Sequence, residues 1–236
     1  MKLAIMQPYF FPYIGYFQLI NAVDKFVIYD DVNFIKRGWV NRNRILLNDA
    51  DHTFSIPVLK ASQNITIANT LIDPSLKWRD KLILTMEHAY RNAPYFSEVF
   101  PLVEKSILKQ CPTIAAYALH SIEAVVDYLE IGTEIVATSS NYGNEQQKGP
   151  DRILDICLKE GATTYINPSG GVGLYDKQPF KDSRVDLHFI YTGQVSYAQQ
   201  KNPFIENLSI IDVLMFNSKT EIKSMLNNYT LEQNGN

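Results

Sequence analysis

The chain is poor in cysteine, has no long apolar run and carries little net charge. Two cysteines in 236 residues, Cys111 and Cys157, exclude a disulfide scaffold and a cysteine-rich zinc site. No apolar run approaches the roughly 20 residues that cross a bilayer, and no small-residue cleavage site follows the N-terminal apolar stretch. A net charge of −3 argues against a surface for duplex nucleic acid. We therefore expect a cytoplasmic protein that binds neither a nucleic acid duplex nor a membrane.

Familiar catalytic motifs are also missing. There is no Gly-x-Ser-x-Gly elbow for a nucleophilic serine, no P-loop and no Gly-x-Gly-x-x-Gly loop. None of the four histidines pairs with another at metal-ligand spacing. We expect no protein-held metal and no required cofactor, so the charge of a phosphate-bearing substrate would be met by arginines and backbone N–H groups.

Short apolar runs alternate with helical patterns in both halves of the chain. Residues 2–7, 25–32, 134–140, 163–171 and 185–192 are typical of strands, and residues 15–22 and 149–161 of helices. Three further helices are predicted within residues 75–129, and two short ones near the C-terminus. Residues 52–60 are predicted as another strand, and residues 227–236 as a frayed tail. The pattern predicts a single α/β domain over residues 1–236, with a mostly parallel sheet, flanking helices and a helical insert at about 75–130.

The densest group of polar and aromatic residues lies between Gln7 and Arg44. Ligands of open α/β sheets bind beyond the carboxyl ends of the strands, and Gln7 and the Asp30-Asp31 pair each follow a predicted strand. Arginine forks suit phosphate or carboxylate, although the same stretch also fits a solvated loop. We expect Gln7, Asp30, Asp31, Arg42 and Arg44 to converge on one cleft. The substrate contacts expected from this segment are Gln7, Tyr9, Asp30, Lys36, Arg37, Arg42 and Arg44.

Two further patterns are weaker. His88 stands near the end of a predicted helix, where it suits either a general base or the helix dipole. A glycine-rich turn follows the strand at 163–171, and its backbone N–H groups suit a phosphate or simply form a tight turn. From this turn we expect substrate contacts by Asn167, Ser169, Gly170 and Tyr175.

The segment QPYFFPYIGYFQLINAVDKFVIYDDVNFIKRGWVNRNRI resembles the opening of the WbqC-like protein family. The resemblance continues through HAYRNAPYF, RILDICLKEGATTYINPSGG and Asn207-Leu208-Ser209-Ile210-Ile211-Asp212, so it covers nearly the whole chain. It implies an enzyme or accessory protein of bacterial O-antigen or capsule synthesis. The activity that it implies is transfer of an acyl or aminoacyl group onto an amino sugar.

The N-terminal strand, proline-containing loop and helix are also similar to the start of nucleotidylyl-transferase-like α/β proteins such as pantothenate synthetase. Those proteins bind ATP phosphates with a His-x-Gly-His element. Here the corresponding stretch is Pro12-Tyr13-Ile14-Gly15-Tyr16, which lacks both histidines.

The leading hypothesis is therefore a transferase that takes a nucleotide-sugar substrate and an acyl or aminoacyl donor. An attacking amine needs a base, for which His88 or Asp31 is expected, and the oxyanion needs donors such as Asn41 or the backbone near Ser169. One alternative is an adenylate-forming amide ligase that uses ATP and Mg²⁺. Another is a non-catalytic binding protein of a polysaccharide-assembly complex.

Overall fold

A six-stranded sheet forms the centre of the molecule. The structure, a computed structural model, describes residues 1–200 and 203–233. The strand order is β5-β2-β1-β6-β7-β8, with the first five strands parallel and β8 antiparallel to β7. The fold is therefore α/β with a mostly parallel sheet, as predicted. The strands are β1 (Lys2–Met6), β2 (Lys25–Ile28), β5 (Glu134–Val136), β6 (Thr164–Pro168), β7 (Asp186–Thr192) and β8 (Tyr229–Glu232).

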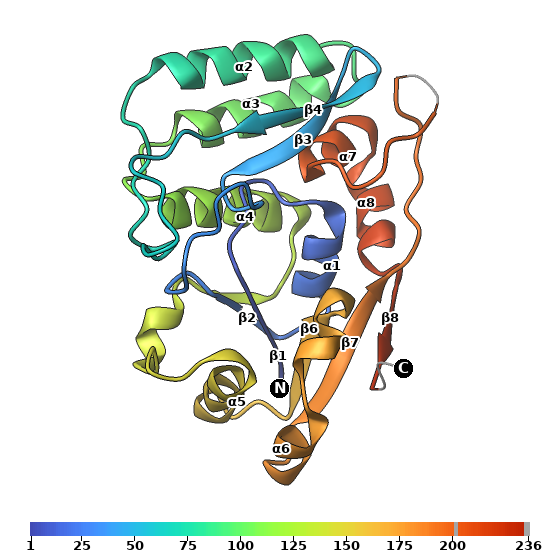
Figure 1. The fold of residues 1–236 in the computed structure, drawn as a ribbon. Coiled ribbons are helices and arrows are strands. Elements are labelled where there is room, and N and C mark those ends of the chain that lie inside the picture. Colours follow the sequence, from blue (N-terminus) through green and yellow to red (C-terminus); the bar gives the residue numbers. More distant parts are fainter. Residues whose placement is uncertain (201–202, 234–236) are drawn as a thin grey trace.

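Helices cover both faces of the sheet, and strand residues alternate between the two sides. Ala4 faces one apolar cluster, whereas Leu3 and Ile5 face the other. The larger cluster includes the mid-chain helices α2–α4, and the smaller one includes α5 (Figure 1). The helices are α1 (Ile14–Asn21), α2 (Lys77–Tyr90), α3 (Phe96–Leu108), α4 (Ile114–Leu129), α5 (Gly149–Lys159), α6 (Lys177–Asp182), α7 (Ile210–Phe216) and α8 (Lys219–Leu226), with 3-10 turns η1 (Ser139–Tyr142) and η2 (Ser169–Leu174).

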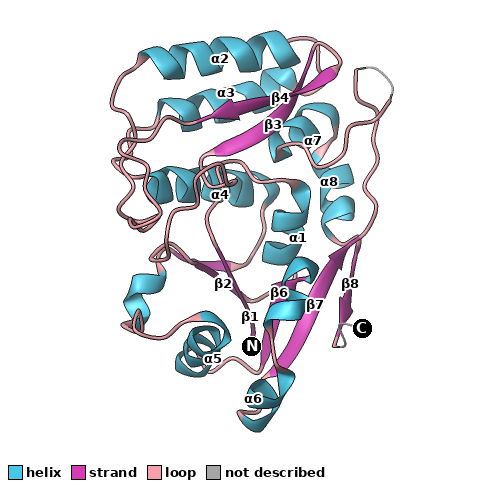
Figure 2. Ribbon diagram, viewed as in Figure 1, coloured by secondary structure: helices cyan, strands magenta, loops and turns pink. Residues whose placement is uncertain are grey.

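A separate hairpin lies outside the main sheet. It pairs β3 (Arg42–Leu47) with β4 (Ala50–Ser55), and Figure 2 shows it as a distinct two-stranded piece. Asn48 and Asp49 form its turn with φ of 52° and 63°, the backbone that two-residue hairpins favour. The alternative of a solvated loop is wrong for Arg42 to Arg44, which lie in β3, where charged side chains conceal the period of two. The segment at 52–60 is strand only as far as Ser55.

The C-terminal segment also differs from its predicted frayed state. Residues 229–232 form β8, whose residues Tyr229 to Glu232 pair with Thr192 to Phe189 of β7. The polar composition misled the prediction because an edge strand needs only one apolar side. The last three residues of the chain, also predicted to be frayed, lie outside the described residues.

The sheet order reverses at β1. The chain passes from β1 to its neighbour β2 and returns only much later to the other neighbour, β6. Loops after β1 and β6 therefore leave toward opposite faces, which opens a crevice at the carboxyl ends of these two strands.

Candidate functional site

The loop between β1 and α1 brings two tyrosines to the carboxyl edge of the sheet. Phe10 and Phe11 are fully buried, and the Phe10 ring stacks on Tyr117 of α4 at 4.7 Å. These two anchors leave Tyr9 and Tyr13 half-buried, where burial raises the pKa of both phenols. Both tyrosines are consequently neutral at physiological pH and present an aromatic face with a hydroxyl group.

Three adjoining cavities open around Tyr13. The Trp39 cavity, of about 330 Å³, is lined by Tyr9, Tyr13, Trp39, Arg44, Thr192 and Asn207 among others. The Gln18 cavity, of about 300 Å³, shares Tyr13, Thr192 and Asn207 with it. The Gly170 cavity, of about 180 Å³, is lined by Tyr13 and Thr192 together with Ser169 and Gly170 after β6. The site is thus one continuous region at the carboxyl edge of the sheet.

Trp39 and Arg44 line the Trp39 cavity, and Arg42 lies beside them next to the Trp39 ring. Arg42 and Arg44 lie on the same side of β3 because strand side chains alternate. Their guanidinium carbons lie 5.9 Å and 6.0 Å from the centre of the Trp39 ring, which is 47% exposed. Arg44 forms an ion pair with Asp51 at 3.1 Å. Arg42 has no carboxylate partner within the described residues, so it is available to an anionic ligand.

Gly15 shapes the wall that the three cavities share. A Cβ at this position would lie 2.4 Å from Cε2 of Tyr13 and 2.8 Å from Cγ2 of Thr192. Glycine therefore lets the Tyr13 ring lie against the first turn of α1. The position of this ring depends on the absence of a side chain at residue 15.

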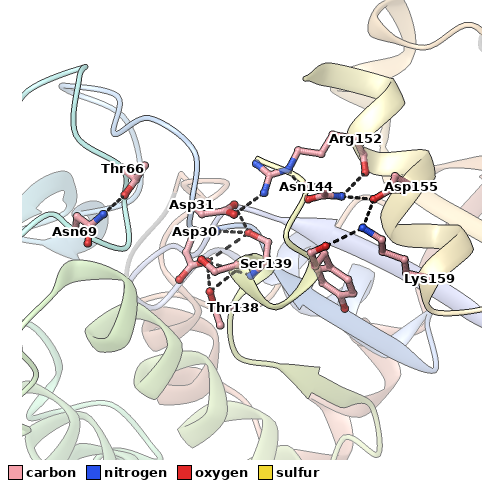
Figure 3. A network of polar contacts seen from close by, with 12 residues as sticks. Asp30, Asp31, Thr66, Asn69, Thr138, Ser139, Asn144, Arg152, Asp155 and Lys159 are labelled. Carbon is pink, nitrogen blue, oxygen red and sulfur yellow. Dashed lines mark hydrogen bonds and ion pairs between the residues drawn. The ribbon is translucent and has the colours of Figure 1, made fainter. Parts of the chain in front are cut away.

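Asp30 and Asp31 form a different network beyond the carboxyl end of β2 (Figure 3). Asp31 forms a buried ion pair with Arg152 of α5 and accepts a hydrogen bond from Ser139. Asp30 accepts hydrogen bonds from the Thr138 hydroxyl at 2.8 Å and the Ser139 amide at 3.1 Å. Both aspartates thus have partners within the protein.

The two opposite charges of this network, on Asp31 and Arg152, are buried and paired with each other. Burial raises the pKa of Asp30, which the hydrogen bonds from Thr138 and Ser139 only partly offset. Burial acts to lower the pKa of Arg152, but the interactions with Asp31 and Tyr29 outweigh burial, so the pKa of Arg152 is raised. The aspartates do not converge with Arg42 and Arg44 as expected. Asp31 pairs with Arg152, and neither aspartate lines any of the three cavities. The strand order accounts for this separation: the aspartates follow β2 and contact Ser139 after β5, whereas the cavities are lined from the segments after β1, β6 and β7.

Residues after β6 divide between two environments. Asn167 is buried, and its Oδ1 accepts hydrogen bonds from Tyr165 at 3.0 Å and Tyr175 at 3.3 Å. Ser169 and Gly170 line the Gly170 cavity. The turn therefore contributes to the site through these two residues, whereas Asn167 and Tyr175 hold the turn in place.

The other predicted residues lie apart from the three cavities. His88 is exposed on α2, whose buried side carries Met86, Ala89 and Tyr90, so the helix turns His88 toward solvent. The Asn41 amide donates to the Ile56 carbonyl at 2.8 Å, which ties β3 to the segment after β4. Lys36 and Arg37 are exposed in the loop before β3, and Gln7 is half-buried directly after β1.

A second network holds the segment between β7 and α7 against the site. Asp212 is fully buried and accepts hydrogen bonds from Tyr90 at 3.0 Å, Tyr197 at 2.7 Å and Gln199 at 3.0 Å. Arg44 donates to the carbonyls of Glu206 and Asn207, each at 3.3 Å. These contacts position the wall that the Trp39 and Gln18 cavities share.

Sequence reasoning missed several lining residues. Trp39 stands inside the cationic stretch and Tyr13 four residues after Tyr9, so both had a local signal in the same aromatic segment. Thr192 and Asn207 reach the site only because β7 and the segment before α7 lie beside the β1–α1 loop. Nothing in their immediate sequence marks them.

The described part of the chain has neither a candidate metal centre nor a candidate membrane-spanning helix. Among residues 1–200 and 203–233, no group of three or more His, Cys, Asp or Glu side chains is placed to hold a metal ion. Within the same part of the chain, no helix has both the length and the apolar character needed to span a membrane.

Comparison with known proteins identifies relatives along almost the full chain. The model of the WbqC-like protein family matches residues 7–224. The uncharacterized protein Rv1507c of Mycobacterium tuberculosis is 31% identical over 228 residues, which is 95% of this chain and 97% of the relative. No solved structure matches.

Proposed function

The chain belongs to the WbqC-like protein family, and from the geometry of its cavities we propose that it is a transferase acting on a nucleotide-linked amino sugar. In this proposal it moves an acyl or aminoacyl group from a donor to the sugar amine during synthesis of bacterial surface polysaccharide. The substrate is bound by protein groups alone, without a required cofactor.

One observation carries the proposal: Arg42 is a half-buried cation that stacks near Trp39 and lacks a carboxylate partner among the described residues. A guanidinium group in that state suits phosphate, which accepts two parallel hydrogen bonds from its fork. Trp39, Tyr9 and Tyr13 supply aromatic faces for a base or a sugar ring next to it. The position beyond the carboxyl ends of β1 and β6 is where α/β proteins bind such ligands.

The three cavities suit the parts of this reaction. The Trp39 cavity suits a diphosphate, because Arg44 lines it and Arg42 lies next to its Trp39 ring. The Gly170 cavity adjoins it and offers the Ser169 hydroxyl and the backbone of a glycine-rich turn. Such donors suit the oxyanion that forms when an amine attacks an acyl carbon.

The proposal is tested by incubating the purified protein with nucleotide-linked amino sugars and acyl or aminoacyl donors, and detecting the N-acylated product by mass spectrometry. We expect Arg42→Ala to lower kcat/KM by roughly 10- to 150-fold, which corresponds to about 1.5–3 kcal/mol for a hydrogen bond to a charged partner. Arg91→Ala, at an exposed arginine after α2, is the matched control and should retain activity.

The other outcomes contradict the proposal in distinct ways. Product that forms only with ATP and Mg²⁺, and is lost in EDTA, indicates the amide ligase. Stabilisation by nucleotide sugars in a thermal-shift assay without any product indicates a non-catalytic binding protein.

A further inference from the structure

We propose that the Gln18 cavity is a recognition site for a primary amine, and that Glu206 binds its ammonium group. This inference rests on the proposed function and deepens it, because it assigns the amine end of the substrate to a particular cavity. It also makes Glu206 a residue that determines specificity.

The charge of the cavity is the first observation. Among the described residues that line it, Glu206 is the only one with a formal charge, and none is a lysine or an arginine. Glu206 is exposed, and no ion-pair partner for its carboxylate exists within the described residues. A carboxylate without a cation, in the wall of a cavity of about 300 Å³, suits a positively charged ligand group.

An unused hydrogen-bond acceptor is the second observation. Gln18 is fully buried, and its Nε2 donates to the carbonyls of Met225 at 2.8 Å and Asn228 at 3.0 Å. These two bonds orient the amide, and its Oε1 is left buried without a donor. The Gln18 Oε1 atom is thus an acceptor without a donor, and the Glu206 carboxylate in the same cavity is an acceptor too. An ammonium group brings three N–H donors and a positive charge, which matches both.

The neighbouring cavity has the opposite charge. The Trp39 cavity is lined by Arg44 with Arg42 beside it, and it shares Tyr13, Thr192 and Asn207 with the Gln18 cavity. Arg44 also donates to the Glu206 backbone carbonyl at 3.3 Å, so the two charged walls adjoin. A ligand with phosphate at one end and an amine at the other fits in one direction only, because the reverse places phosphate against a carboxylate.

Three small probes separate the two cavities: inorganic pyrophosphate, glucose 1-phosphate and glucosamine 1-phosphate. Their dissociation constants are measured by calorimetry on the full chain. We expect the wild-type protein to bind glucosamine 1-phosphate about 10-fold or more tightly than glucose 1-phosphate, a difference of about 1.4 kcal/mol. Glu206→Gln should bring this ratio close to one and leave the pyrophosphate affinity unchanged. Glu87→Gln, at an exposed carboxylate on α2, is the control and should keep the wild-type ratio.

Each remaining outcome overturns a defined part of the argument. If both sugar phosphates bind equally to the wild-type protein, or if Glu206→Gln keeps the preference, the amine site is refuted and the phosphate site stands. If none of the three probes binds, the phosphate site fails, and the amine inference fails with it. Arg42→Ala should weaken all three probes alike, which distinguishes the phosphate contact from the amine contact.

Discussion

Replacing Arg152 with methionine should destabilise the protein strongly, because it leaves a buried carboxylate without its counter-ion. The Arg152 and Asp31 side chains are only 3% and 7% exposed. The substitution also removes the hydrogen bond from Nε to Asn144 at 2.9 Å and the contact of the guanidinium with the Tyr29 ring at 5.0 Å. Breaking a buried pair from one side costs about 3–5 kcal/mol, and we expect Arg152→Met to fall in that range.

Urea denaturation followed by circular dichroism measures this loss. Domains of ordinary size are stable by about 5–15 kcal/mol, so the variant should unfold at a much lower urea concentration with an unchanged slope. Combining Asp31→Asn with Arg152→Met removes both charges and should restore about 1–2 kcal/mol relative to Arg152→Met. Lys223→Met, at the exposed pair with Glu130, is the control and should leave the midpoint unchanged.

A loss below about 1 kcal/mol for Arg152→Met would refute the reasoning, since that is the value of an exposed pair. A double variant less stable than Arg152→Met would also refute it, because it would show that Asp31 is stabilising without its partner. Either result would mean that water reaches this pair.

Three other variants test the remaining assignments. Gly15→Ala should displace the Tyr13 ring, because its Cβ would lie 2.4 Å from Cε2 of Tyr13, and should weaken pyrophosphate and nucleotide-sugar binding in calorimetry. Unchanged affinity would contradict the role of the ring. Lys25→Met should cost about 1 kcal/mol at pH 7. Burial acts to raise the pKa of Glu160, but hydrogen bonds led by Lys25 hold this pKa below its usual value. The stability that Lys25 contributes is therefore present above the unfolded-state pKa of Glu160 and is lost as the pH falls through its folded-state pKa. A stability difference between Lys25→Met and the wild-type protein that persists in urea titrations at pH 3 would contradict this reasoning. His88→Gln should leave turnover within about twofold, because the side chain is in solvent on α2; a 100-fold loss in the product assay would return His88 to the role of base.

Much of the fold could be read from local patterns. The apolar runs that contain β1, β2, β6 and β7 and the helical periods of α2–α5 are set by burial, which imposes a period of 2 or 3.6 on the side chains. The hairpin β3–β4 and the edge strand β8 escaped this reading. Their stability comes from pairing and from one buried side, while their exposed sides carry the polar residues that resemble loops.

The site could be located only in part. The strand ends and the aromatic loop after β1 predicted a site at the edge of the sheet where the three cavities lie, and Tyr9, Arg44, Ser169 and Gly170 line these cavities. His88 does not, because the phase of α2 rather than the chemistry of histidine decides which way the side chain points. Thr192 comes from β7, a strand whose own sequence pattern reflects only its burial.

The sequence by itself determined the α/β class, the strand ends and the supply of arginines and tyrosines, since these follow from short-range periodicity and composition. Only the tertiary structure decided which charge meets which. Asp31 is 11 positions from Arg42 in the chain, yet it pairs with Arg152, which is 121 positions away. The reason is physical: electrostatic partners are chosen by distance in space and by burial, and a parallel sheet brings the ends of strands together that are far apart in sequence. Within the described residues Arg42 has no carboxylate partner, because Asp31, which stands near it in the sequence, pairs with Arg152 instead.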